Sequence, residues 1–245
     1  MEMEIIMKAK SIIKITVDLA MTVILLLLMA YEFTGSGRHT SLGIAEFVLF
    51  IIHCFLNRKW YAALFKGRYN LSRVMRTLIN LGVLASMVGL MISAAILSDG
   101  FGLIDIRAGV FFARRLHMLS SHWGFIFMSL HLGLHWMTIL KVLRKRFGVP
   151  KKTAATALKI AAAAIAAFGI YAFINDDILS YMLLTREFAG FDDPKGFAGI
   201  IADYVSIMGA CVFISHYAAP VFDRIFKRPK KTGAAPFAAE SRRCG

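Results

Sequence analysis

Six long apolar stretches leave this chain few ways to fold. Each is close to the length of about 20 mostly apolar residues that a helix needs to cross the hydrocarbon core of a bilayer. Hydrophobic residues make up 58% of the 245 residues, which exceeds the roughly 45–50% typical of a soluble domain. The stretches lie near Ile15–Tyr31, Thr40–Leu56, Leu78–Leu97, Leu116–Leu140, Leu158–Ile174 and Gly199–Val221. The sequence therefore predicts an all-α, polytopic membrane protein with six transmembrane helices surrounded by lipid.

The distribution of positive charge predicts the orientation of these helices. All but six of the 29 Lys and Arg residues lie in the N-terminal segment, the second and fourth loops and the C-terminal tail. Because segments rich in Lys and Arg stay on the cytoplasmic side, both termini are expected in the cytoplasm. The basic residues lie between apolar stretches and not on one polar face, which argues against binding to nucleic acid.

The spacing of four histidines points to a bound cofactor. His39 and His53 are 14 residues apart in the second stretch, and His117 and His131 are 14 residues apart in the fourth. Fourteen residues make almost four helical turns, so each pair lies on one helix face, about 21 Å apart along the axis. Since the second and fourth helices run in the same direction, His39 is expected level with His117, and His53 level with His131.

Two opposed imidazoles at each of two depths are typical of bis-histidine haem ligation in a helical bundle. A single metal ion would instead require three or four ligands in one cluster. The sequence therefore predicts two non-covalent b-type haems. Covalent attachment of the c type is excluded, because the chain has no Cys-x-x-Cys-His motif.

The remaining histidines are expected to have other roles. His135 lies on the ligand face one turn after His131, where it could bind a haem propionate or a quinone, or form a structural hydrogen bond. His122 points about 140° away from His117 and cannot share its face. His216 in the last stretch has no partner at the same level, so ligation by it is not expected.

Several charged residues accompany the histidines. Arg38, Arg114 and Arg115 adjoin the outer ligands, where they could pair with haem propionates or anchor the helices at the interface. Glu46 lies seven residues from both His39 and His53. An ionisable group so deep in a membrane suggests a function: proton uptake on haem reduction, or a hydrogen bond to a ligand imidazole. A protonated acid bonded to a neighbour is the structural alternative.

Small residues recur near the histidines. Gly43 follows His39 by one turn, Gly82 and Gly89 share a face of the third stretch, and Gly124 lies midway between His117 and His131. Such residues are expected either to make room for haem macrocycles or to permit ordinary close packing of helices.

Two segments also suggest a known family. The segment from Arg38-His39-Thr-Ser-Leu-Gly43 to His53-Cys-Phe-Leu-Asn57-Arg-Lys-Trp60 resembles the flavinylation-associated cytochrome family of prokaryotic membranes, as does Leu116-His117 through His131-Leu-Gly-Leu-His135-Trp136. The paired spacing is also similar to cytochrome b of respiratory bc complexes. The resemblance covers roughly Ile12–Arg144. It implies that the four paired histidines ligate two b haems, in a protein of the prokaryotic cytoplasmic membrane whose partners carry covalent flavin.

These observations predict three regions. Residues 1–146 form a cytochrome b-like four-helix haem-binding bundle, residues 147–226 add two transmembrane helices with an outer loop, and residues 227–245 form a disordered basic tail. Within the outer loop, the apolar segment Ile178–Leu184 is expected to lie along the membrane interface.

The predicted function is transmembrane electron transfer, which links a quinol or a cytoplasmic donor to an extracytoplasmic flavoprotein or cytochrome docked on acidic outer loops. No bond-making catalytic residue is expected, and membership of a quinone-linked oxidoreductase is left open. One alternative is a membrane transporter that uses histidines and Glu46 for metal ions or protons. The other is a haem-containing anchor subunit of a larger oxidoreductase.

Overall fold

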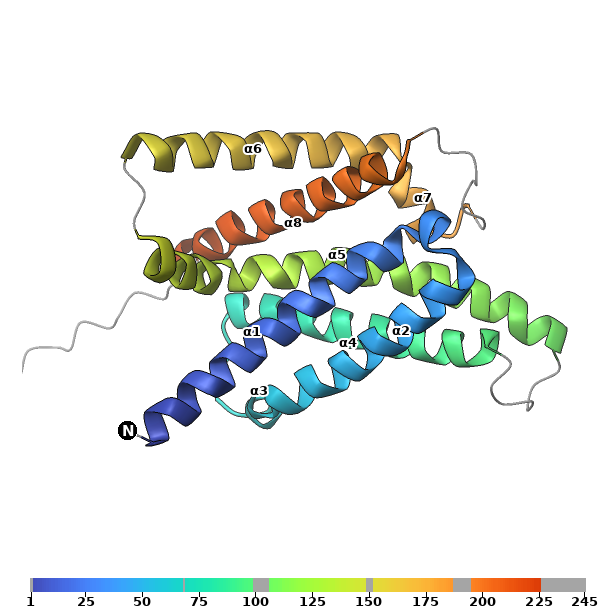
Figure 1. Cartoon of the computed structure of the whole chain (residues 1–245), viewed down its shortest axis with the longest axis horizontal. Coiled ribbons are helices and arrows are strands. Elements are labelled where there is room, and N and C mark those ends of the chain that lie inside the picture. Colours follow the sequence, from blue (N-terminus) through green and yellow to red (C-terminus); the bar gives the residue numbers. More distant parts are fainter. Residues whose placement is uncertain (1, 68, 99–105, 149–151, 187–194, 226–245) are drawn as a thin grey trace, which may run out of the picture.

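The computed structural model describes residues 2–67, 69–98, 106–148, 152–186 and 195–225. These residues form eight helices and no strand (Figure 1). The helices are α1 (Glu2–Met29), α2 (Tyr31–Leu56), α3 (Arg58–Leu64), α4 (Leu71–Leu97), α5 (Ile106–Phe147), α6 (Lys152–Asn175), α7 (Ile178–Met182) and α8 (Phe197–Ile225). The predicted all-α class is confirmed, and the tail predicted to be disordered lies outside the described residues.

Six of these helices are long and apolar enough to cross a membrane. Their candidate spans are Ile12–Met29, Tyr31–Leu56, Leu71–Leu97, Gly109–Lys145, Lys152–Asn175 and Phe197–Ala218. They coincide with the six predicted stretches, including the Ala-rich fifth. The prediction of a multi-pass membrane protein is therefore confirmed.

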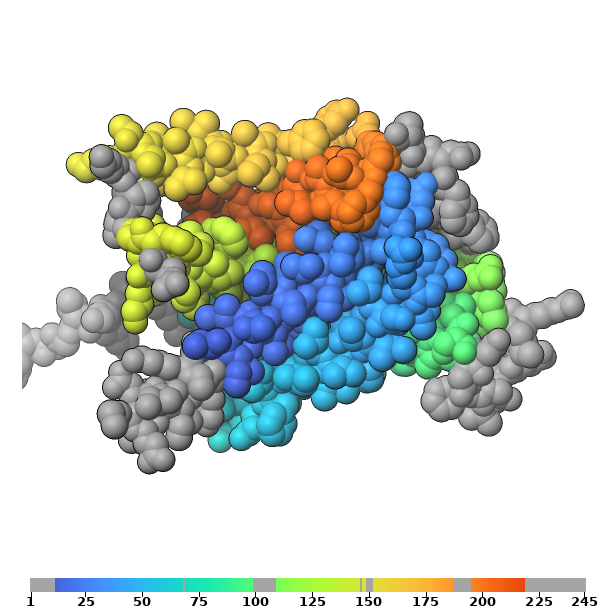
Figure 2. All heavy atoms as spheres, viewed as in Figure 1, coloured from blue at the N-terminus to red at the C-terminus, as the bar shows by residue number. Residues whose placement is uncertain are grey.

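The helices are arranged around α5. Along its length α5 packs against α4 on one side and against α8 on another, while α1 runs along α2 (Figure 1). α6 lies at the edge of the bundle and packs mainly against α8. In Figure 2 the side chains of α1 and α2 lie against each other and form one continuous face. α2 and α5, the helices that carry the four regularly spaced histidines, thus belong to different helix pairs within one bundle.

The connection between α1 and α2 is shorter than the sequence predicts. Only Ala30 separates the two helices, and the chain instead bends inside α2 at Gly35, where φ is 66° and ψ is 166°. Glycine adopts positive φ readily because it has no Cβ. The regular part of α2 therefore begins just before His39, and this bend places the first histidine at the start of a straight helix.

The short helix α7 buries one of its faces against the bundle, while Leu179 and Leu183 on its other side are exposed. Its expected position along the membrane interface stays a prediction. Ile178 and Met182 are only 3% and 5% exposed. The indole Nε1 of Trp123 on α5 donates a hydrogen bond to the carbonyl oxygen of Met182, at 3.0 Å. Both apolar residues belong to a buried cluster with Phe125 and Ile207. The segment is thus part of the core that joins α5 to α8.

A second apolar cluster holds the N-terminal helices together. Val17 and Met21 of α1, Phe50 of α2, and Val83 and Met87 of α4 are buried in it. Side chains of α5 also pack against this cluster. Since Phe50 precedes His53 by three residues, the cluster lies along the part of α2 that carries His53.

Candidate functional site

The structure brings four histidines together in two pairs between α2 and α5. The ring centroids of His39 and His117 are 6.0 Å apart, with the ring planes at 62°. Those of His53 and His131 are 6.4 Å apart, with the planes at 75°. We call these the outer pair and the inner pair. The pairing is the one that the two 14-residue spacings predict, and it requires α2 and α5 to run in the same direction.

A serine on α4 holds His117 of the outer pair. Its hydroxyl oxygen, Ser93 Oγ, lies 3.0 Å from Nδ1 of His117. The hydroxyl also lies 2.9 Å from the carbonyl oxygen of Leu90, to which it can donate its proton. In that arrangement Ser93 accepts from Nδ1 of His117, and the lone pair of the ring lies on Nε2.

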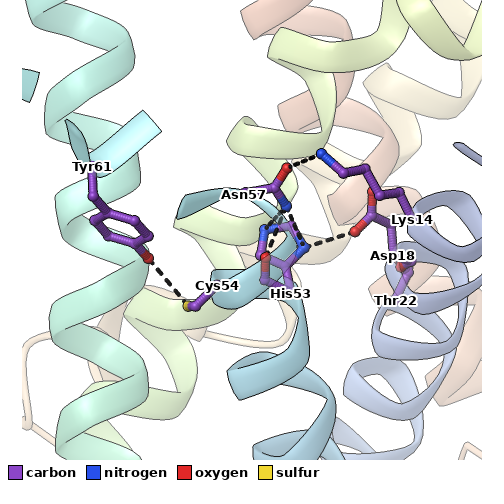
Figure 3. Close-up of polar contacts among 7 residues, drawn as sticks. All are labelled: Lys14, Asp18, Thr22, His53, Cys54, Asn57 and Tyr61. Atoms are coloured by element: carbon purple, nitrogen blue, oxygen red, sulfur yellow. Dashed lines mark hydrogen bonds and ion pairs between the residues drawn. The ribbon is translucent and has the colours of Figure 1, made fainter. Parts of the chain in front are cut away.

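A carboxylate on α1 fixes the tautomer of His53 in the inner pair. Asp18 Oδ1 lies 2.7 Å from Nδ1 of His53 (Figure 3). A carboxylate only accepts hydrogen bonds, so the proton lies on Nδ1 and the lone pair on Nε2. Nε2 lies 3.4 Å from the amide nitrogen of Asn57, which donates a long hydrogen bond to it. Asn57 adds support one turn later, since its amide nitrogen donates to the carbonyl oxygen of His53, at 3.0 Å. The amide oxygen of Asn57 accepts a hydrogen bond from Lys14, at 3.0 Å.

The tautomer of His131 depends on how the amide of Asn80 is turned. The amide oxygen lies 2.8 Å from Nδ1 of His131, an orientation in which the ring donates and Nε2 is free. The opposite orientation lets the amide nitrogen donate to Nδ1 and to the carbonyl oxygen of Arg76, while the oxygen accepts from Nε1 of Trp60. The second orientation satisfies more of the neighbouring donors and acceptors, and in it Nδ1 of His131 accepts and Nε2 carries the proton. Binding of a metal ion through Nε2 requires the first orientation.

The fourth histidine, His39, is held differently. Its Nδ1 is buried without a hydrogen-bond partner among the described residues. The ring of Tyr31 packs edge-on against it, with the centroids 5.0 Å apart. Three of the four paired rings thus have a polar partner at Nδ1, and the fourth is placed by an aromatic contact.

Glu46 lies between the two pairs along α2. Its side chain is only 4% exposed, and Oε2 has no hydrogen-bond partner among the described residues. An unpaired carboxyl group in an apolar interior is energetically unfavourable. The burial agrees with the mid-membrane position expected from the sequence, and its proton role stays a prediction.

The other predicted site residues make fewer contacts with the two histidine pairs. His135 lies beside the inner pair, with its ring centroid 4.8 Å from that of His131. Arg38 and Arg114 are exposed next to the outer pair in sequence, and the guanidinium of Arg115 lies 5.5 Å from the ring centre of Phe111 on its own helix. The acidic loop residues expected to dock a redox partner lie largely outside the described residues, namely Asp99, Asp105, Glu187, Asp192 and Asp193.

The histidines that the sequence analysis set aside lie away from the pairs. His122 is buried, its Nδ1 donates to the carbonyl oxygen of Met118 at 2.9 Å, and its ring stacks on Tyr181 of α7. His216 packs against the neighbouring ring of Tyr217. Both contacts are structural, and His122 in particular helps to hold α7 against α5.

The glycines between α4 and α5 permit close helix packing. A Cβ placed at Gly89 would lie 2.3 Å from Oγ of Ser120, and one at Gly124 would lie 3.1 Å from Cβ of Ser86. A Cβ at Gly82 would meet the ring of Phe127. These three positions therefore bring α4 against α5 and do not make room for a macrocycle. At Gly43, by contrast, no described atom lies within 4 Å of such a Cβ, so room-making stays a prediction there.

Sequence reasoning missed two of the Nδ1 partners. Asn80 and Ser93 are 13 residues apart on α4, nearly the histidine spacing, because α4 runs alongside α5 and supports both of its histidines. The contact of Asp18 on α1 with His53 was not predicted either. A search for polar residues repeated at the histidine interval on neighbouring helices would have found the α4 pair.

Within the described residues, no group of three or more His, Cys, Asp or Glu side chains comes together to hold a metal ion. Each level of the site offers two opposed imidazoles, and His135 adds a third ring beside His131 at the inner level. Comparison with known proteins gave no match to any family model, curated protein or solved structure. Function must therefore be inferred from the site itself.

Proposed function

We propose that this protein is a membrane cytochrome that carries electrons between the two faces of a prokaryotic cytoplasmic membrane. His39 and His117 would ligate one b-type haem, and His53 and His131 a second. The haem iron supplies one-electron chemistry when bound. The observation that carries the proposal is the opposition of two imidazole pairs at two depths, with ring centroids 6.0 and 6.4 Å apart.

The ring separations fit a shared metal ion. A metal ion binds an imidazole nitrogen at about 2.0–2.1 Å, so two rings on opposite sides of one ion have centroids about 6 Å apart. Two ligands do not satisfy a first-row metal ion, whereas a porphyrin contributes four more and needs only two axial imidazoles. The donor set therefore suits haem better than a bare ion, which disfavours the alternative of a metal-ion transporter.

The hydrogen bonds at Nδ1 also support ligation. Metal-binding histidines usually donate their other ring N–H to a carboxylate, carbonyl or water, which fixes the ring orientation. Asp18 accepts such a bond from His53, and Ser93 lies where it can accept one from His117. With the proton on Nδ1, the lone pair of each ring lies on Nε2, which in His53 also accepts a long hydrogen bond from the Asn57 amide. The chain's own contribution is thus to place, orient and bury the axial nitrogens.

The two histidine pairs lie toward opposite ends of the helices, so each would serve a different redox partner. An extracytoplasmic flavoprotein or cytochrome would exchange electrons at the outer pair, and quinol near His135 or a cytoplasmic reductase at the inner pair. The same geometry would serve a haem-bearing anchor subunit of a larger oxidoreductase, and co-purification with a catalytic subunit would identify that case.

Absorption spectroscopy of the purified full-length protein tests the proposal. Reduced low-spin haem bands, with a pyridine haemochrome assay near two haems per chain, are the expected result. His53→Ala should leave one haem, whereas His122→Ala, at a buried histidine outside both pairs, should leave two. Colourless protein from iron-replete cells, or an unchanged haem content in His53→Ala, would overturn the proposal.

A further inference from the structure

The two pairs differ in the charge beside their rings. Nδ1 of His53 in the inner pair donates to the carboxylate of Asp18, 2.7 Å away, whose side chain projects from α1 toward the ring (Figure 3). In the outer pair, Nδ1 of His117 lies 3.0 Å from the neutral hydroxyl of Ser93, and Nδ1 of His39 has no hydrogen-bond partner among the described residues. Asp18 is thus the one carboxylate seen in contact with a paired histidine in the described part of the chain.

A carboxylate at Nδ1 changes the ligand electronically. An imidazole that donates to a carboxylate becomes a more basic ligand through its other nitrogen. A more basic ligand, together with a nearby negative charge, stabilises the more positive, oxidised form of the iron that it binds. Hydrogen bonding and local charge are among the factors by which a protein sets a haem potential.

Lys14, on α1 like Asp18, carries a positive charge that would raise the potential of the inner site. Its ammonium group donates to the Asn57 amide oxygen at 3.0 Å, so the Asn57 amide lies between it and His53. Asp18, by contrast, touches the ring directly. Because Coulomb energy falls with distance, and Asp18 also bonds to the ring, the carboxylate has the larger effect.

We infer that Asp18 makes the inner site the lower-potential of the two, so that electrons run downhill from the His53–His131 side to the His39–His117 side. This inference rests on the proposed function. In each transfer, one electron leaves the inner site, which is oxidised, and enters the outer site, which is reduced. A one-electron donor at the inner face and a one-electron acceptor at the outer face complete the balance, and Asp18 acts through His53 as a positioning residue.

The first test is the order of the potentials in single-haem proteins. His39→Ala should retain only the inner site and His53→Ala only the outer one, so redox titration monitored by absorbance assigns each midpoint. The inner midpoint is expected below the outer. An inner midpoint equal to or above the outer overturns the inference and leaves the proposed function intact.

The second test changes Asp18 in the two-haem protein. Asp18→Asn keeps an acceptor oxygen but removes the charge, and it should raise the inner midpoint alone. We expect the equilibrium constant for transfer from the inner to the outer site to fall about tenfold, which equals about 59 mV for a one-electron couple. Asp18→Glu should restore most of the difference. Thr22→Ala, one turn further along α1, removes only a bond to the Asp18 carbonyl oxygen and should change neither midpoint.

The possible results distinguish failure of the proposed haem binding from failure of the proposed role of Asp18. A wild-type protein without haem overturns both the proposed function and this inference. Two haems with no selective shift in Asp18→Asn, or equal shifts at both sites, overturn only the role of Asp18. Should Asp18→Asn fail to hold the inner haem, the midpoints of the single-haem proteins still decide the order.

Discussion

The inner and outer histidine pairs share one spacing and the same two helices, yet their rings are held in different ways. The outer pair has a serine hydroxyl and a tyrosine ring as neighbours. The inner pair has a carboxylate, two amide side chains and a third histidine around it. Spacing along α2 and α5 thus determines which histidine rings pair. Side chains on the neighbouring helices determine the charge and the hydrogen bonds around each pair.

The largest effect that would test this comparison is the loss of one haem. His117→Ala should give the same single-haem spectrum and midpoint as His39→Ala, because each removes an axial nitrogen from the outer site. His131→Ala should match His53→Ala in the same way. Absorbance spectra and redox titrations of the four variants check the pairing. Matching behaviour of His117→Ala and His53→Ala would show that the rings pair differently.

A smaller effect is expected from the residues on α4 that support the rings. Asn80→Ala should weaken haem retention at the inner site, and Ser93→Ala at the outer site. Loss of such hydrogen-bond partners typically lowers the affinity of a metal site by about 10–100-fold. Haem content after expression with limited haem supply, combined with the midpoint of the haem retained, measures the effect. Equal losses at both sites in either variant would contradict separate support for each pair.

Glu46 lies between the pairs, so its replacement should not distinguish them. Glu46→Leu should keep both haems and raise the free energy of unfolding, because it removes a buried oxygen that has no partner among the described residues. Such an unsatisfied group costs about 1–3 kcal/mol. The thermal midpoint of the detergent-solubilised protein measures this gain. Loss of haem or a lower midpoint would instead show that Glu46 contacts the bound group or stabilises the bundle.

The smallest effect concerns an ion cluster outside both pairs. Lys195 bridges the carboxylates of Asp176 at the end of α6 and Asp203 on α8. Desolvation acts to lower the pKa of Lys195, but the hydrogen bonds and charges of both carboxylates outweigh it and raise that pKa above its ordinary value of 10.5. Lys195→Met should therefore destabilise the fold by about 1 kcal/mol or less.

The pH dependence of that change has a definite sign. Stability from a lysine with a raised pKa is fully present below its unfolded pKa and is lost as the pH rises through the folded pKa. Thermal midpoints of the wild type and Lys195→Met should therefore differ at pH 7 and converge only above about pH 10.5. Haem content should be equal in both proteins. Convergence at neutral pH would show that the cluster does not stabilise the fold.

The spans and the pairing of rings could be predicted from sequence because both follow from local helix geometry. Hydrophobic length gives each span, and a 14-residue interval gives two residues on one face. The partners of the rings could not be predicted, since Asp18, Asn80 and Ser93 lie on other helices whose rotation the sequence does not reveal. The glycines of α4 and α5 show the same limit, because a small residue indicates close approach without naming what approaches.

Two local features depend on details that hydrophobic periodicity does not reveal. Ile178–Leu184 is apolar and short, and contacts with Trp123 and the cluster around Phe125 bury one of its faces, while Leu179 and Leu183 stay exposed. After α1, the positive φ of Gly35 produces a bend within α2.

The length of α5 has a mechanical consequence. Its 42 residues extend about 63 Å, well beyond the about 40–45 Å of a whole bilayer with headgroups. The helix is therefore expected to extend beyond the bilayer, with Lys141, Arg144 and Lys145 on one protruding end. His117 and His131 lie on this one continuous helix. A change in membrane thickness would therefore change the tilt of α5 without changing the distance between the two histidines along its axis.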